Sequence, residues 1–242
     1  MKVTCLTFSL LFLWSVFAAA QNNEGIIYFE EKVNMHRSLP PDAADIKAMI
    51  PEFRTHKNEL LFNATESLYR NVEEEEDDDD GDGSGIVIKM QRPEATFYRN
   101  FATMHQADAR EFFGKNYLIE DSLTMPDWKV TTETKTILGY PCMKATTTDT
   151  TRKREIVAWF TGGISLSSGP AQYSQLPGMI LEVDINNGEI AISAQKVEFK
   201  KLKKGELEAP RKGEKIDAAG FDKLMADRLR ENGGRQMRII RN

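Results

Sequence analysis

The sequence predicts a mainly β protein: an antiparallel meander that forms one curved sheet or half-barrel of about ten strands, with a C-terminal amphipathic helix and a short N-terminal helical segment. Short segments rich in β-branched and aromatic residues recur along the chain, separated by Gly, Pro, Asn or Asp. No long helical pattern lies between them, whereas parallel strands need crossovers of about a dozen residues. The 242 residues are 40% hydrophobic, which is enough for one core.

Residues 1–20 have the features of an export signal. Lys2 precedes an apolar run over 3–17, and the alanines at 18–20 provide small residues for cleavage. The run is shorter than the roughly 20 residues that span a bilayer, so we expect a cleaved signal peptide. The expected mature chain, residues 21–242, is one domain without a transmembrane span, exported to the periplasm or cell envelope.

The predicted strands of this domain follow one another without long interruptions. They are residues 25–35, 60–70, 86–91, 96–103, 112–121, 128–134, 136–147, 155–160, 179–185 and 189–200. Asn187-Gly188, between the last two, is the strongest hairpin signal in the sequence. The apolar side chains of the final strand change parity after Ala194, which predicts a β-bulge near Gln195 and Lys196.

Two helical segments are predicted. Residues 42–50 lie between prolines and predict a short helix. In the C-terminal helical region, 210–232, Asp217 is a suitable N-cap, and Gly233 and Gly234 are expected to end the helix. The apolar stripe of this helix consists of Phe221, Leu224, Met225 and Leu229.

Acidic residues are concentrated in one short run, residues 73–85. The net charge of -5 depends on nine acids in this run, so it predicts no nucleic-acid-binding face. A calcium loop numbered from Asp78 would need Glu at its twelfth position, where the chain has Lys89. We therefore expect a solvated acidic loop.

The sequence contains no catalytic or metal-binding motif that we recognise. His36, His56 and His105 are far apart, so we expect neither a metal nor another cofactor. Cys142 is the single cysteine of the expected mature chain, and the alternating strand around it predicts a buried, apolar role. The sequence thus favours a protein that is not an enzyme.

The long connection between strands 155–160 and 179–185 is the candidate binding site. Pro177-Gly178 predicts a type II turn, because Pro fixes φ and Gly accepts a positive φ. Long loops often carry function. The candidate binding residues are Trp159, Tyr173, Leu176, Pro177, Gly178, Met179 and Ile180. In the alternative, these side chains plug the open end of a curved sheet.

Four ordered blocks of the sequence resemble the GLPGLI family. They are TKTILGYPCMKA at 134–145, AWFT at 158–161, GP at 169–170 and LPGMILE at 176–182. The family consists of exported Bacteroidetes proteins of unassigned function, named for a Gly-Leu-Pro-Gly-Leu-Ile motif. This chain has Gln175 in place of the leading Gly and Met179 in place of the second Leu. The resemblance implies envelope export and a β-rich domain over 21–242, and it supplies no catalytic residue or cofactor.

The favoured function is a non-enzymatic binding or assembly module of the bacterial cell envelope. An apolar ligand or a segment of an envelope protein would lie on the curved sheet. The alternatives are an enzyme whose site is dispersed in the sequence and a strand-accepting partner of an outer-membrane complex. The sequence does not define the oligomeric state.

Overall fold

The computed structural model describes residues 23–40, 42–72, 93–149 and 153–239. The predicted signal peptide, the predicted strand at 86–91 and the acidic loop at 73–85 lie outside the described residues.

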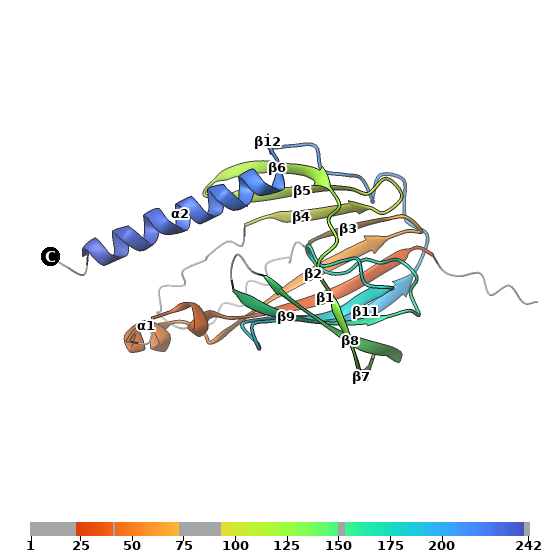
Figure 1. The fold of residues 1–242 in the computed structure, drawn as a ribbon, viewed down its shortest axis with the longest axis horizontal. Coiled ribbons are helices and arrows are strands. Elements are labelled where there is room, and N and C mark those ends of the chain that lie inside the picture. Colours follow the sequence, from red (N-terminus) through yellow and green to blue (C-terminus); the bar gives the residue numbers. More distant parts are fainter. Residues whose placement is uncertain (1–22, 41, 73–92, 150–152, 240–242) are drawn as a thin grey trace, which may run out of the picture.

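The described residues form twelve strands in one sheet (Figure 1). The strands are β1 (Gly25–Asn34), β2 (Phe53–Phe62), β3 (Glu66–Asn71), β4 (Ala95–Asn100), β5 (His105–Phe112), β6 (Lys115–Ser122), β7 (Lys129–Ile137), β8 (Tyr140–Asp149), β9 (Arg154–Thr161), β10 (Met179–Ile185), β11 (Ile190–Phe199) and β12 (Glu214–Ile216). Their order across the sheet is β12-β6-β5-β4-β3-β2-β1-β11-β10-β9-β8-β7.

Two antiparallel meanders make up this sheet. Strands β1 to β6 form one and β7 to β11 form the other, and antiparallel pairing of β1 with β11 joins them. The short β12 adds to β6 in parallel. The predicted fold class, a curved antiparallel sheet with a C-terminal helix, is confirmed, although the described strands number twelve instead of about ten.

The predicted strands need correction in several places. The boundary predicted between 128–134 and 136–147 is wrong, because β7 continues to Ile137 and the turn lies at 138–139. The segment predicted at 60–70 contains a turn at residues 63–65 and splits into β2 and β3, and β2 already begins at Phe53. The strand β5 was missed because Ala107, Asp108 and Ala109 have low β propensity. The three-residue β12 carries too little sequence pattern to be recognised.

The predicted hairpin and bulge are confirmed. The turn between β10 and β11 uses Asn186, Asn187 and Gly188, all with positive φ, as the Asn-Gly signal requires. The pairing of β1 with β11 passes from Tyr28–Lys196 to Phe29–Ala194 and leaves Gln195 as the extra residue. This bulge accommodates the parity change read from the sequence.

In Figure 1 one helical segment lies beyond the ends of the central strands β1 and β2, and a longer helix runs beside β6. A 3-10 turn, η1 (Met35–Ser38), and α1 (Ala44–Met49) lie in the connection between β1 and β2. The helix α2 (Ala218–Ile239) is capped by Asp217, whose Oδ1 accepts the Gly220 N–H at 2.7 Å. The expected end at Gly233 and Gly234 is wrong, since the helix continues through both; an interior glycine costs only about 1 kcal/mol.

The two faces of the sheet carry separate apolar clusters. Successive side chains of a strand point to opposite faces, so Ile27 and Phe29 of β1 lie on one face and Ile26 and Tyr28 on the other. We call these the main face and the reverse face. The connection at 162–178 packs on the main face, and Leu202, Leu207 and Ala209 of the connection at 200–213 pack on the reverse face.

A third, smaller cluster joins α2 to the sheet. Phe221 packs on Tyr117 and Ile119 of β6, with Leu224 and Met225 beside it, as the predicted stripe requires. The side chain of Leu229 lies outside the described part of the structure. Within that part, no helix combines the length and hydrophobicity that crossing a membrane requires.

Candidate functional site

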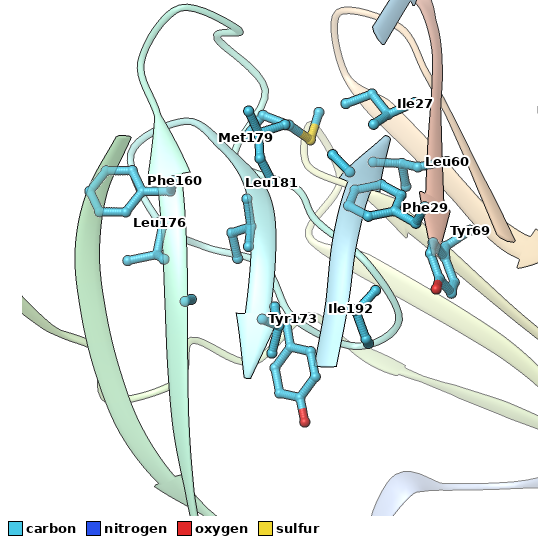
Figure 2. Close-up of a cluster of buried hydrophobic side chains, with 14 of the residues drawn as sticks. Ile27, Phe29, Leu60, Tyr69, Phe160, Tyr173, Leu176, Met179, Leu181 and Ile192 are labelled. Carbon is cyan, nitrogen blue, oxygen red and sulfur yellow. The ribbon is translucent and has the colours of Figure 1, made fainter. Parts of the chain in front are cut away.

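The connection at 162–178 is a buried component of the main face. Leu176, Met179 and Ile180 are at most 1% exposed, although the first of them belongs to a segment without helix or strand. Figure 2 shows Met179 and Leu176 among Phe160, Leu181 and Ile27, side chains from separate strands. Their burial favours the alternative role, in which the loop plugs the sheet.

Hydrogen bonds fix the path of this connection. The N–H groups of Met179 and Ile180 donate to Ile164 O at 3.1 Å and Ser168 O at 2.8 Å. The Ser168 hydroxyl donates to Ser67 Oγ of β3 at 2.7 Å. Because buried backbone polar groups are costly without partners, this network is what allows the segment to lie in the core.

The turn at Pro177-Gly178 differs from the predicted type II turn in its hydrogen bonding. Gly178 N–H donates to Leu176 O at 2.7 Å, whereas Met179 N–H donates to Ile164. The need for glycine is confirmed: φ of Gly178 is +136°, and a Cβ there would lie 2.1 Å from Thr161 O. Gln175, at the position of the leading Gly in the GLPGLI motif, also has a positive φ of +72°.

Six of the seven candidate binding residues lie within 173–180, and most of these six are buried. Pro177 is exposed, whereas Leu176, Gly178, Met179 and Ile180 are buried. Trp159 on β9 is half-buried and packs against the main-face cluster, and Lys135 Nζ lies 4.4 Å above its ring. Tyr173 is the candidate whose side chain lines a described cavity. A binding role for the seven stays a prediction.

Two cavities lie on the main face, and both are lined by Arg110 and Gln172. The first, of about 220 Å³, is lined by β4, β5, β6, the segment at 123–126, the 162–178 connection and the start of α2. The second, of about 290 Å³, lies against β10 and β11. Its apolar wall consists of Tyr69, Phe97, Ile156, Tyr173, Ile185, Ile190 and Ile192.

A buried ionic cluster, Arg99–Asp108–Arg110, lies where β4 and β5 line the cavities. Asp108 is opposite Phe97 in the antiparallel pairing, and alternation places Arg99 and Arg110 on the same face. Arg99 donates to both carboxylate oxygens of Asp108, and Arg110 Nη2 donates to Oδ2 at 2.9 Å. The Arg99–Asp108–Arg110 cluster thus engages one carboxylate with two guanidinium groups.

Aromatic rings hold Arg110 in place. Its guanidinium carbon lies 4.7 Å from the Phe97 ring centroid and 5.5 Å from that of Phe221 on α2. Arg110 remains 23% exposed in its side chain, against 4% for Arg99. It is therefore an oriented cation that a ligand can reach.

Sequence reasoning did not identify the Arg99–Asp108–Arg110 cluster. Two signals were present: Arg99 stands in the middle of an aromatic strand, and Asp108 and Arg110 are two residues apart, which places them on one face of a strand. Recognising the pair required β5 to be predicted as a strand. Recognising the triad also required the register between β4 and β5.

Cys142 is buried, as the sequence predicts. The side chain belongs to the main-face cluster, and its Sγ donates to Tyr140 O at 3.4 Å. Burial raises the pKa of this thiol, because the thiolate would lose its hydration. The thiol therefore behaves as a small apolar core group.

The described residues form a mainly β domain with cavities on one face of its sheet. Residues 88–222 match the family described as "N-glycanase peptide, N-terminal domain". This match covers more than half of the chain. The chain therefore belongs to that family. A comparison with curated protein sequences gives no match.

Solved structures with a similar fold include two of PNGF-II. The structure in space group C2 gives a TM-score of 0.56 at 18% identity and covers 83% of this chain and 32% of that chain. The structure in space group P21 gives 0.55 at 18% identity, over 84% of this chain and 33% of that one. The likeness concerns the fold, and the chain spans about a third of the length of these proteins.

Proposed function

We propose that this protein is a non-enzymatic binding module of the bacterial cell envelope, which holds an apolar ligand or a partner segment on its curved sheet. The observation that carries the proposal is the isoleucine-rich and aromatic wall of the second cavity, next to the oriented Arg110. Ligand sites commonly combine an apolar lining with a few placed polar groups. The resemblance to the GLPGLI family and the predicted export signal favour the envelope location.

The hydrogen bonds and the burial of Asp108 favour a binding role over a catalytic role. A general base must present a carboxylate to its substrate. Both oxygens of Asp108 already accept hydrogen bonds from guanidinium groups, and the side chain is 5% exposed. In this proposal the carboxylate orients the two arginines and transfers no proton.

Native mass spectrometry of the protein purified from its own envelope tests this function. We expect a copurified apolar molecule or polypeptide that is released when the protein unfolds. Protein of the mass of the mature chain alone, from gentle purification without detergent, would contradict the proposal.

Family membership supports a second candidate function, binding of an N-glycosylated polypeptide. The family description names an N-glycanase, so a domain of this family would help to hold such a substrate. The test compares retention of a glycoprotein with that of the same protein after deglycosylation. Retention that depends on the glycan would support this candidate, and equal retention would count against it.

A further inference from the structure

Arg110 lies at the junction of the two main-face cavities and has unused hydrogen-bonding capacity. Its Nη2 donates to Asp108, while its Nε is buried and makes no hydrogen bond within the described part of the chain. The described contacts also leave its Nη1 without an acceptor. Because Nε is inaccessible, an additional anionic partner would bind the accessible part of the guanidinium, whose side chain is 23% exposed.

The charge balance of the Arg99–Asp108–Arg110 cluster also favours an anionic partner. Two guanidinium groups share one carboxylate, which leaves one positive charge in a site where Arg99 and Asp108 are nearly inaccessible. The exposed Asp222 lines the first cavity but makes no ion pair with any described cation. At low dielectric an unbalanced charge interacts strongly with an opposite one.

The second cavity carries other charges as well. Glu31, Asp149 and Arg154 line it, and Arg154 is already paired with Glu189 at 2.5 Å. The two acids disfavour an anion at their own positions. An anionic group is therefore favoured at Arg110, at the end of this cavity that is shared with the first.

The apolar wall beside Arg110 indicates the chemistry of the rest of an anionic ligand. Ile156, Ile185, Ile190 and Ile192 face a space of about 290 Å³, near the lower limit of the roughly 300–1,000 Å³ of common ligand sites. A short apolar chain fits this volume. Phe97 both lines the wall and lies against the Arg110 guanidinium, so the charged and apolar subsites are contiguous.

We propose that Arg110 binds the carboxylate of a short-chain amphiphilic acid, whose apolar chain lies along the isoleucine wall. This inference rests on the proposed binding function and names the chemical class of its apolar ligand. The rigid guanidinium pairs well with a carboxylate, and charge-assisted hydrogen bonds of this type are about twice as strong as neutral ones.

Three probes with the same alkyl chain separate the contribution of charge to the affinity from the hydrophobic contribution. Isothermal titration of the full protein with octanoate, octan-1-ol and octylammonium at neutral pH is expected to give the tightest binding for octanoate. We expect its affinity to exceed that of octan-1-ol about tenfold, with octylammonium weakest. These measurements need no variant, so they do not depend on whether a substitution folds.

Arg110→Met then tests the residue itself. Methionine keeps an unbranched apolar stem against Phe97, so the affinity for octanoate should fall about tenfold to the level of octan-1-ol, which itself should change little. Arg228→Met is the matched control, because Arg228 lies on the exposed face of α2 and pairs with Glu231. The control should bind all three probes as wild type does.

The outcomes distinguish this inference from the function on which it rests. Equal affinity of the wild type for octanoate and octan-1-ol would overturn the anion site and leave apolar binding intact. Unchanged octanoate affinity in a folded Arg110→Met protein would also overturn it. If none of the three probes binds, both the inference and an apolar small-molecule ligand are contradicted.

Discussion

Two long connections without helix or strand cover opposite faces of the sheet, and they differ in depth. The 162–178 connection buries Leu176 at 1% exposure and donates or accepts hydrogen bonds with β3 and β10. In the 200–213 connection no residue is buried, and Leu202 and Leu207 only rest on the reverse-face cluster. The absence of regular structure therefore does not identify a surface loop, because a segment whose backbone groups have hydrogen-bond partners can lie in the core.

Met179→Asp is the harshest test of this contrast. Met179 follows directly after the 162–178 connection and is 0% exposed, so a carboxylate there would be buried without a partner. We expect loss of cooperative unfolding by circular dichroism. Met143→Asp is the control, since Met143 is 42% exposed and should leave the melt nearly unchanged. A Met179→Asp protein as stable as wild type would mean that this region opens readily to water.

Truncation of one leucine in each connection gives a graded comparison. Leu176→Ala should lower the free energy of unfolding by about 2–5 kcal/mol, because it leaves a cavity in a packed core. Leu207→Ala should cost about 1 kcal/mol or less, because its side chain is only half-buried. Denaturant titrations measure both. Equal losses would remove the distinction between the two connections.

Two glycines within the 162–178 connection isolate the backbone contribution. Gly178→Ala should cost about 2–3 kcal/mol, because it combines a positive φ with a Cβ directed at Thr161 O. Gly162→Ala should change stability little, since a Cβ there meets nothing within 4 Å. If the two variants have the same melting temperature, the turn at Gly178 accommodates a side chain more easily than its geometry implies.

The smallest expected effect concerns the pH dependence of the main-face cluster. The raised pKa of Cys142 means that the folded state holds the thiol proton more tightly than the unfolded state does. The associated stability is present below the unfolded thiol's pKa, about 8.5, and is lost as pH rises through the folded value. Cys142→Ala should flatten the decline of stability above that pH. A slope identical to wild type would mean that the thiol does not contribute.

Strand signals in the sequence were sufficient to predict the fold class, but not every strand or the side chains that cover the sheet. The Asn-Gly hairpin and the bulge at Gln195 were predictable, because turn conformation and side-chain parity are local properties. The depth of Leu176 was not, because its burial depends on contacts with β9 and β10 that only the fold brings together. The sequence therefore singled out this connection and left open whether it binds a ligand or fills the core.

The cavity residues were still harder to predict. Arg99 and Asp108 form their ion pair across two strands whose register is set by the whole meander. Arg110 is oriented by Phe221, which lies more than a hundred residues away in the chain. A local sequence pattern cannot predict a contact between residues so far apart in the chain.

Amide hydrogen exchange on the native protein tests most directly whether the 162–178 connection belongs to the core. We expect the amides of Gln175, Met179 and Ile180 to exchange at a rate close to that of global unfolding, because they donate to Ser167 O, Ile164 O and Ser168 O. The amide of Glu206, which donates to Lys203 O within the exposed connection, should exchange far faster. If the amides of Met179 and Ile180 exchange as fast as that of Glu206, the 162–178 connection does not belong to the core.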